Sequence, residues 1–467
     1  MVLALIVGCS GSSDTTPTPT PTDAGETGHT GTLATTLSDP NFRLHPEVGS
    51  LPIVSWTQSR GATVRVEVEV DPGEWTSTPP IEGLVGTNEQ TLVGIPFGAT
   101  VAWRVVADDG TTLEPEPLTT GPVPDGFPLG EVTVSDPSRW LPEGKFLLTS
   151  INARPGGWTG GTYWTFIIDR KGRPVWARQT PQNHWTLFVA LDRDGRSLWW
   201  DEQTYWASLG VDDGVNSRLH HVWLDAEMEL VPTPGLHHTW VQLPDGTLVW
   251  GSKAHGGIEA LVQRVPGQKD ETVLWTCEED WPGSGECESN GLFYSEATDT
   301  FLYSFYTNNS IVEVDHATGA SRWWAGQVAD GYAFSPVRSQ YLWQHGISYT
   351  PTGSLLVSSE WDGGAQPPGR CQWMPTGCHT WLMEYEVDPA SQELRASWVN
   401  DSGVLADTNG QAWRLANGNT LHIVGSAGVV REVDTATGED VWRVDWHSDR
   451  LLGAGQLLDD LYPLLQP

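Results

Sequence analysis

The chain has 467 residues, of which 38% are hydrophobic and only 18% are charged, and it contains 51 Gly and 33 Pro. This length suits two or three domains, and the turn-rich, charge-poor composition predicts an all-β protein with many short strands rather than a helical bundle, a coiled coil or a disordered chain. The formal net charge of −34 excludes nucleic acid and other polyanions as partners, because most of the surface would repel them.

The first nine residues resemble a lipoprotein signal segment. Ile6-Val7-Gly8-Cys9 follows a short apolar run and resembles a bacterial lipobox, in which the chain is cleaved before the Cys and that Cys is lipidated. The alternative is a short disordered apolar tail. Because no Lys or Arg precedes the apolar run, we expect the true start codon to lie upstream.

Residues 10–32 consist mainly of Ser, Thr, Pro, Gly and Asp, and they have too few apolar side chains to form a core. We expect them to be a disordered tether between a membrane and the folded part. The predicted location is therefore the bacterial cell envelope, in the periplasm or at the cell surface, with the lipid anchor as the sole contact with a membrane.

Four further cysteines form two local pairs, Cys277 with Cys287 and Cys371 with Cys378. In an oxidising compartment, such pairs predict two disulfides that each close a loop. A zinc site is the alternative, but neither pair has the CxxC spacing that such sites favour. We expect no metal and no cofactor.

Residues 33–120 alternate short β-branched runs with turns. Val64, Val66, Val68 and Val70 alternate with polar residues, which is typical of a strand with one buried face. About ninety residues of this kind predict a small β-sandwich of the immunoglobulin or fibronectin type. Residues 121–144, which begin with a Pro-rich stretch, are predicted to be a linker.

From residue 145 to residue 467 the chain repeats a pattern of four strands. Thr239–Trp250 shows one half of the repeat, an apolar strand followed by a Gly turn and a second apolar strand, and Ile311–Trp323 shows the other half, which ends in a Trp. Units begin near residues 145, 184, 237, 288, 343 and 409. Six units of about fifty residues predict a six-bladed β-propeller.

In a propeller the first strand of each repeat lines the central channel, and ligands bind at its mouth. Ten residues before the Leu that follows the Gly turn, three repeats carry His238, His345 and Gln411. Two histidines in one repeat phase indicate a functional site at the mouth. The plainer alternative is that the repeat places a polar residue there to bond channel water.

These motifs resemble those of the bacterial arylsulfate sulfotransferases. The resemblance rests on the Gln-His pair at 344–345, the His-His pair at 237–238 and the sequence Asn-Gly-Asn-Thr-Leu at 417–421, and it extends over roughly residues 35–450. It implies an exported six-bladed propeller with an N-terminal β-sandwich. It also implies PAPS-independent transfer of a sulfuryl group from a phenolic sulfate to a phenol acceptor, through a sulfohistidine intermediate.

The resemblance places the nucleophile at His345 and the second catalytic histidine at His238, or at His237 if the register shifts by one. His238 would hold or protonate a sulfuryl oxygen or the phenol, Asn290 would donate a hydrogen bond, and Gln411 would contribute to the same mouth.

The chain departs from the family pattern at two positions. Glu288 stands where the family has a His, and Tyr306 stands where it has an Arg. Both changes remove a group that could stabilise sulfuryl oxygens, and a carboxylate at 288 is expected to raise the pKa of a neighbouring histidine. Tyr306, Trp343 and Arg414 are the candidate replacement donors.

A different class of function also fits, a non-catalytic, surface-anchored propeller that binds a ligand or a protein partner at its Trp-rich mouth. The geometry separates the two hypotheses. The enzyme requires the side chains of His238, Asn290 and His345 to converge at one end of the channel.

Overall fold

The computed structural model describes residues 34–153, 161–204, 217–283, 286–361, 371, 377–447 and 450–467. The predicted signal segment, with Cys9, and the whole of the predicted tether lie outside these residues. The described part is almost entirely β-structure, with three short 3-10 helices, η2 (Val337–Ser339), η3 (Gly425–Ala427) and η4 (Tyr462–Leu464). Among these residues, no helix has the length and apolar character needed to cross a membrane.

The N-terminal part is the predicted β-sandwich. Its core is formed by the alternating buried side chains of facing strands, among them Trp56, Val66 and Trp103. One sheet contains β1 (Leu37–Leu44), β2 (Pro52–Gln58) and β6 (Gly86–Thr91). The other contains β3 (Ala62–Asp71), β4 (Glu74–Ser77), β5 (Ile81–Gly83), β7 (Thr100–Ala107), β8 (Thr112–Leu113) and β9 (Leu118–Thr119).

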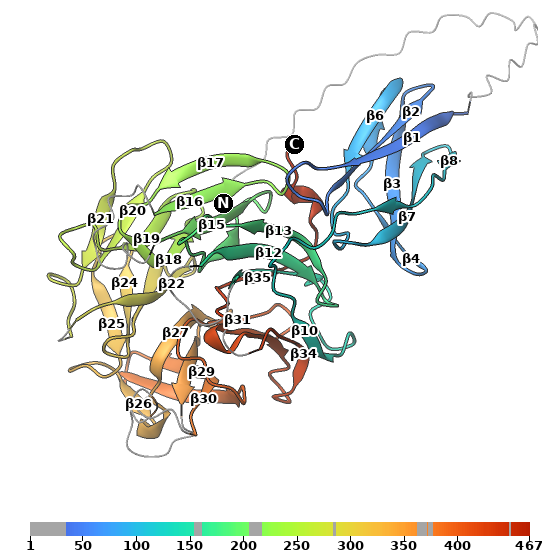
Figure 1. Cartoon of the computed structure of the whole chain (residues 1–467). Helices are drawn as coiled ribbons and strands as arrows, with labels where there is room; N and C mark the ends of the chain where they lie inside the picture. Colours follow the sequence, from blue (N-terminus) through green and yellow to red (C-terminus); the bar gives the residue numbers. More distant parts are fainter. Residues whose placement is uncertain are drawn as a thin grey trace, which may run out of the picture.

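The rest of the described chain is the β-propeller, whose sheets follow one another around a channel (Figure 1). We number the six sheets formed by described residues in chain order. Sheet 1 has β11 (Phe146–Asn152), β12 (Tyr163–Asp169), β13 (Pro174–Gln179) and β35 (Gln456–Leu458). Sheet 2 has β14 (Val189–Leu191), β15 (Leu198–Glu202), β16 (Arg218–Val222) and β17 (Glu227–Pro232).

Sheets 3 to 5 each begin with their channel strand. Sheet 3 has β18 (Leu236–Gln242), β19 (Leu248–Ser252), β20 (Ala260–Arg264) and β21 (Thr272–Thr276). Sheet 4 has β22 (Ser289–Ser295), β23 (Thr300–Phe305), β24 (Ser310–Asp315) and β25 (Ser321–Ala325). Sheet 5 has β27 (Leu342–Tyr349), β28 (Leu355–Trp361), β29 (His379–Asp388) and β30 (Glu393–Asp401), with β26 (Ala333–Ser335) parallel to β30 at its outer edge.

Sheet 6 has β31 (Gln411–Arg414), β32 (Thr420–Val424), β33 (Val429–Val433) and β34 (Asp440–Asp445), and its outermost strand is β10 (Glu131–Ser135). The segment predicted as a linker, residues 121–144, therefore contains a strand of the propeller. In sheet 1 the innermost strand is the C-terminal β35 rather than β11. The expectation that the first strand of every repeat lines the channel is wrong for sheet 1, because two distant segments close the ring there and in sheet 6.

Buried tryptophans near the outer edges of the sheets connect neighbouring sheets. The indole N–H of Trp176 donates to the carbonyl of Leu224 at 2.9 Å, and that of Trp442 donates to the carbonyl of Arg170 at 2.9 Å. Each bond runs from one sheet or its flanking turn to the next. The Trp that ends the second half of the repeat therefore fixes the angle between sheets.

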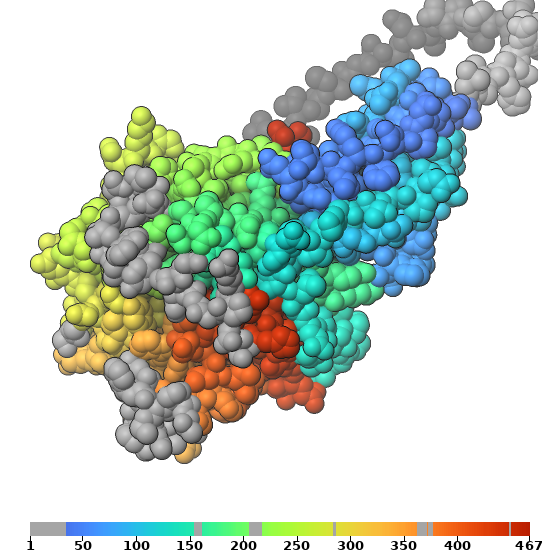
Figure 2. Space-filling model, in the orientation of Figure 1, coloured from blue at the N-terminus to red at the C-terminus, as the bar shows by residue number. Residues whose placement is uncertain are grey.

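The sandwich packs against sheet 1 of the propeller (Figure 2). Arg173, in the turn before β13, binds both oxygens of Asp71 at 3.0 and 3.1 Å. Ser50 donates a buried hydrogen bond to the carbonyl of Val175 at 2.7 Å. These bonds, with the shared apolar core beneath them, join the sandwich to the side of the ring.

Candidate functional site

The two histidines predicted from the repeat phase lie on irregular stretches of their channel strands. The pairing register shifts between Leu236 and Trp240 in β18, and between Leu342 and Gly346 in β27. Within these stretches His238 has φ of 63° and Trp343 has φ of 49°, a conformation that bulky residues rarely adopt. Bulges of this kind redirect side chains and are frequent beside active sites.

The aromatic rings of sheets 3, 4 and 5 form a continuous row at this end of the channel. Ring centroids are 6.3 Å apart for His238 and Tyr306, 5.3 Å for Tyr306 and Trp343, and 6.3 Å for Trp343 and His345. The pKa of His238 is lowered well below its usual value by burial, and then by coulombic interaction with His237, His345 and Lys253. The structure therefore brings His238 and His345 together at one mouth.

His345 is held in a single tautomer. Its Nδ1 lies 3.0 Å from the carbonyl oxygen of Trp343, and a carbonyl can only accept, so Nδ1 carries the proton and Nε2 carries the lone pair. Burial lowers the pKa of His345 to about 4, which keeps the ring neutral at pH 7. Nε2 has no hydrogen bond to any residue that the structure describes. The ring is therefore in the neutral tautomer, with a lone pair on Nε2, that a nucleophilic histidine requires.

Glu288 is neutralised by a cation that the sequence interpretation missed. Nζ of Lys253 lies 2.6 Å from Oε1 of Glu288, and the hydroxyl of Tyr306 donates to Oε2. Burial raises the pKa of Glu288, but the hydrogen bonds from Lys253 and Tyr306 outweigh it and the net shift is downward. The expectation that Glu288 would raise the pKa of a neighbouring histidine is wrong for both His345 and His238, because burial dominates and Lys253 compensates the carboxylate.

Asn290 and Gln344 join sheets 4 and 5. The buried Asn290 side chain donates to the carbonyl of Gln344 at 2.5 Å and accepts from the hydroxyl of Ser304 at 2.9 Å. The Gln344 amide in turn donates to Ser304 and to the carbonyls of Phe305 and Ser310. Asn290 thus fixes the main chain beside His345, and its amide is already bonded within the protein.

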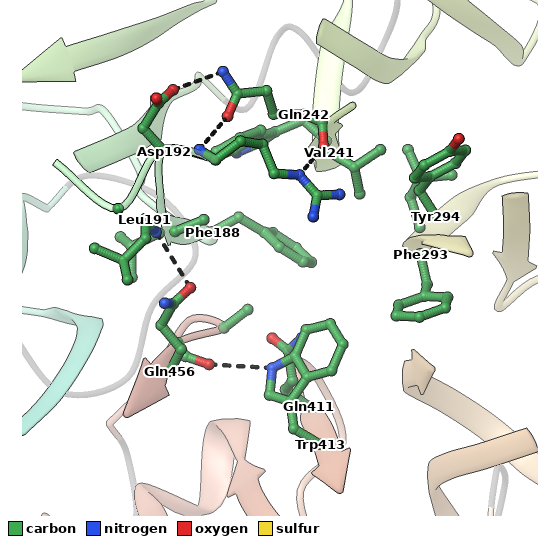
Figure 3. A pocket seen from close by; sticks show the side chains of 18 of the residues that line it. Phe188, Leu191, Asp192, Val241, Gln242, Phe293, Tyr294, Gln411, Trp413 and Gln456 are labelled. Atoms are coloured by element: carbon green, nitrogen blue, oxygen red, sulfur yellow. Dashed lines mark hydrogen bonds between the residues drawn. The ribbon is translucent and has the colours of Figure 1, made fainter. Parts of the chain in front are cut away.

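Gln411 lies at the start of β31 and borders a cavity of about 610 Å³ in the channel (Figure 3). The cavity extends from Gln411 toward the ends at which the channel strands finish, away from the histidines. Five aromatic side chains line it: Phe188, Trp240, Phe293, Tyr294 and Trp413. Gln411 Oε1 and Trp240 Nε1 are buried and have no hydrogen-bond partner among the described residues.

Arg414 does not reach the histidine mouth. It lies at the opposite end of β31, where it binds Glu384 at 2.5 Å and stacks over Trp398 at 5.3 Å. Of the three candidate replacement donors, Tyr306 and Trp343 lie at the mouth and Arg414 does not.

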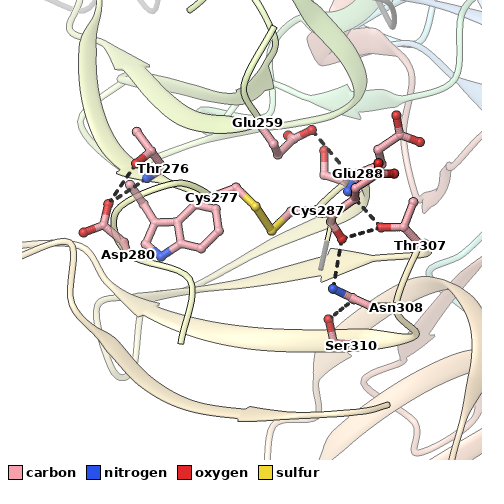
Figure 4. Close-up of a disulfide and its surroundings, with 12 residues drawn as sticks. Glu259, Thr276, Cys277, Asp280, Cys287, Glu288, Thr307, Asn308 and Ser310 are labelled. Atoms are coloured by element: carbon pink, nitrogen blue, oxygen red, sulfur yellow. Dashed lines mark hydrogen bonds between the residues drawn. A yellow bond between two sulfur atoms is a disulfide. The ribbon is translucent and has the colours of Figure 1, made fainter. Parts of the chain in front are cut away.

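The two predicted disulfides are confirmed. Cys277 and Cys287 have Cα atoms 6.0 Å apart, and Cys371 and Cys378 have Cα atoms 5.6 Å apart. The first disulfide lies beside the mouth, since Cys287 immediately precedes Glu288 (Figure 4). Disulfides of this kind form in oxidising compartments, which indicates an exported chain.

Glu259 and Lys253 are the functional residues that the sequence interpretation missed. Lys253 follows the second strand of sheet 3, and Glu259 precedes the third. Neither residue belongs to a motif. Neither lies on a channel strand, and the comparison of equivalent repeat positions covered the channel strands alone. Among the described residues, no group of three or more His, Cys, Asp or Glu side chains is arranged to hold a metal ion.

No family model and no curated protein matches the chain. Solved structures that are similar include a protein of unknown function from Bacteroides caccae, at 12% identity over 63% of this chain and 93% of that one, with a TM-score of 0.39. A putative 6-phosphogluconolactonase from Bacteroides fragilis is 12% identical over 84% of this chain and 98% of that one, with a TM-score of 0.39. The β-propeller domain of Cps50 (Swd1) from Myceliophteria thermophila is 12% identical over 68% and 86%, with a TM-score of 0.37. At these identities and TM-scores the likenesses indicate no activity.

Proposed function

We propose that this protein is an exported, PAPS-independent aryl sulfotransferase that works through a sulfohistidine at His345. The observation that carries the proposal is the neutral His345 ring, held by the Trp343 carbonyl so that Nε2 carries the lone pair. His238 interacts electrostatically with His345 and Lys253, and a second histidine and a cation are groups that can assist sulfuryl transfer.

In the first half of the reaction, Nε2 of His345 attacks the sulfur of an aryl sulfate. The bond between sulfur and the aryl oxygen breaks, and the leaving phenolate takes, through His238, the proton that the acceptor phenol of the preceding turnover supplied. In the second half, His238 accepts the proton of an acceptor phenol, whose oxygen attacks the sulfur as the N–S bond breaks. Lys253, whose ammonium has protons beyond the one that binds Glu288, is the group available to stabilise the sulfuryl oxygens, whereas the single hydroxyl proton of Tyr306 is donated to Glu288.

The test measures release of 4-nitrophenol from 4-nitrophenyl sulfate, with phenol as acceptor, by the disulfide-intact chain. His345→Ala should lower turnover by at least about 10³-fold, as removal of a covalent nucleophile does. His220→Gln, on the second propeller sheet, is the control and should retain turnover. Mass spectrometry of protein quenched in alkali should find one added SO₃ group on His345. A folded wild-type protein without turnover would refute the proposal.

The channel cavity favours a second candidate, a non-catalytic propeller that binds a neutral aromatic ligand. Its five aromatic side chains and two unpartnered buried polar atoms suit a flat molecule that both donates and accepts hydrogen bonds. Calorimetric titration with 2-naphthol tests this, with Trp413→Ala in the cavity and Trp398→Ala outside it as control. Loss of binding in the first variant only would support the candidate, and absence of binding by the wild type would exclude it for this class of ligand.

We also propose that a lipid on Cys9 anchors the protein to the cell envelope. The proposal rests on the lipobox resemblance and on the two disulfides, which place the folded part in an oxidising compartment. Metabolic labelling with an alkyne fatty acid should mark the full-length protein and not Cys9→Ser. Equal labelling of both would refute it.

A further inference from the structure

Three buried or half-buried side chains form a row of hydrogen bonds that ends at the mouth. Oε2 of Glu259 lies 2.8 Å from Nε2 of His237, and Nδ1 of His237 lies 3.1 Å from Nδ1 of His238. Glu259 and His237 are each only 2% exposed. The first two members of the row are therefore nearly closed to solvent, and the hydrogen bonds connect them to His238.

Glu259 is the charged end of the row. Its Oε1 accepts from the hydroxyl of Tyr303, and its Oε2 also accepts from the main-chain N–H of Ser289 at 3.4 Å. Burial raises the pKa of Glu259, but the charge of His237 and hydrogen bonds from His237 and Tyr303 bring it below its usual value. A carboxylate only accepts hydrogen bonds, so the proton between Glu259 and His237 belongs to Nε2 of His237.

The proton on Nε2 of His237 determines which ring carries the proton between the two Nδ1 atoms. When His237 is neutral, its Nδ1 has no proton and must accept, so Nδ1 of His238 carries the proton that joins the two rings. Since Nδ1 of His238 is committed to His237, any proton exchange between His238 and a substrate takes place at Nε2.

His238 is also fixed through its main chain. Its N–H donates to Oε1 of Gln203 at 2.8 Å, and the residue is held at positive φ within the bulge of β18. A side chain set by a strained main chain and by a ring-to-ring hydrogen bond has little freedom to turn, which is the preorganisation that acid–base catalysis requires.

We infer that Glu259 and His237 are positioning residues of a proton relay that makes His238 the general acid and base of the site. The inference rests on the proposed sulfuryl transfer. When the acceptor phenol loses its proton to Nε2 of His238, the Nδ1 proton of His238 moves to Nδ1 of His237, and the resulting imidazolium is paired with the Glu259 carboxylate. This proton stays on His237 until the next aryl sulfate reacts, when the reverse movement delivers it through Nε2 of His238 to the leaving phenolate.

The charged and titratable groups around the relay come from sheets 3, 4 and 5. His345 of sheet 5 and Lys253 of sheet 3 act on His238, and Tyr306 of sheet 4 lies beside it. The charges of His237 and Glu288 also interact. The residue of sheet 2 that contacts the relay, Gln203, is uncharged. Among the described residues, Glu259 is the sole carboxylate that is hydrogen-bonded to His237.

The first measurement is the tautomeric state of the rings by long-range ¹H–¹⁵N NMR of the folded, disulfide-intact protein. In the wild type, at a pH at which both rings are neutral, Nδ1 of His238 and Nε2 of His237 should be protonated. Glu259→Gln should change the tautomer of His237, because an amide can donate where the carboxylate accepts. Glu202→Gln is the matched control, since Glu202 binds Nε2 of His220 at the same 2.8 Å but lies outside the relay. Unchanged tautomers in Glu259→Gln would overturn the inference whether or not the protein turns over.

The second measurement compares leaving groups. Glu259→Gln should slow turnover of unsubstituted phenyl sulfate by about 10²- to 10⁴-fold, the range for loss of acid–base catalysis. It should slow 4-nitrophenyl sulfate much less, because nitrophenolate leaves without a proton. An equal loss with both substrates would mean a structural role and overturn the relay. If Glu259→Gln does not fold, His237→Gln provides the same comparison. Absence of turnover in the wild type would instead count against the proposed function.

Discussion

A β-carbon placed on Gly346 would lie 2.5 Å from the Cα of Gln411. The channel strands of sheets 5 and 6 therefore touch main chain to main chain at the residue that follows His345. No side chain fits between them, so the absence of one at position 346 sets the distance between the two strands and the position of the His345 ring.

Gly346→Ala is expected to destabilise the fold by about 1–3 kcal/mol, as overpacking does, and to lower turnover by displacing His345. Gly161→Ala is the matched control, because no atom lies within 4 Å of a β-carbon there. Denaturant unfolding and the nitrophenol assay measure the two effects. Equal stability of both variants would show that the strands can separate without cost.

Lys253→Met is expected to leave Glu288 charged, without its cation and with only the hydrogen bond from Tyr306. Glu288 is a third exposed, so the loss of stability should lie between surface and buried pairs, at about 1–2 kcal/mol. Turnover should fall by about 10²-fold or more, because the cation proposed to stabilise the sulfuryl oxygens is lost. Adding Glu288→Gln to this variant should recover the stability but not the turnover. Recovery of both would assign Lys253 a purely structural role.

Glu360→Gln is expected to stabilise the protein at high pH. Burial, and then the charge of Asp407, raise the pKa of Glu360 to about 8 in the folded state, whereas an unfolded Glu titrates near 4.3. Between these values the folded state holds one more proton, so wild-type stability falls as pH rises, with a limiting slope of about 1.4 kcal/mol per pH unit. The difference in unfolding free energy between variant and wild type should grow from pH 5 to pH 8 and then level off. A constant difference across this range would contradict the pKa of Glu360.

Replacing Cys277 and Cys287 by Ser is expected to cost about 2–4 kcal/mol, the usual effect of opening a short disulfide loop. Turnover should fall as well, measured at a temperature at which the variant is folded, because Cys287 fixes the start of the segment that carries Glu288. Replacing Cys371 and Cys378 by Ser should lower stability alone. Loss of turnover in both variants would mean that the effect is not local to Glu288.

The repeat pattern was sufficient to predict the propeller and the two histidines. The Leu that follows each Gly turn, such as Leu248 and Leu355, marks the same point in each sheet, so counting back from it reaches structurally equivalent positions, His238 and His345. Residues at the same position of different repeats occupy equivalent places in the structure, because the strands of each sheet follow one another in the same order.

The groups that support these histidines could not be predicted in this way. Glu259 is 22 residues from His237, and Lys253 is 35 residues from Glu288. Each pair meets only because neighbouring strands or sheets pack together, and a single sequence carries no signal for such a contact. The role of Arg414 was overestimated for a related reason, since the repeat phase did not show at which end of β31 its side chain would lie.

The ring is closed twice by segments far apart in the chain, β35 against β11 in sheet 1 and β10 against β34 in sheet 6. Both closures pair strands that are separated by about three hundred residues, which gives the fold a high contact order and predicts slow folding. During synthesis and export, sheet 1 lacks its channel strand until residues 456–458 have emerged. Until then the edge of β11 that pairs with β35 is unpaired. A protease that removed this short segment from the finished protein would reopen the same edge without touching any residue of the mouth.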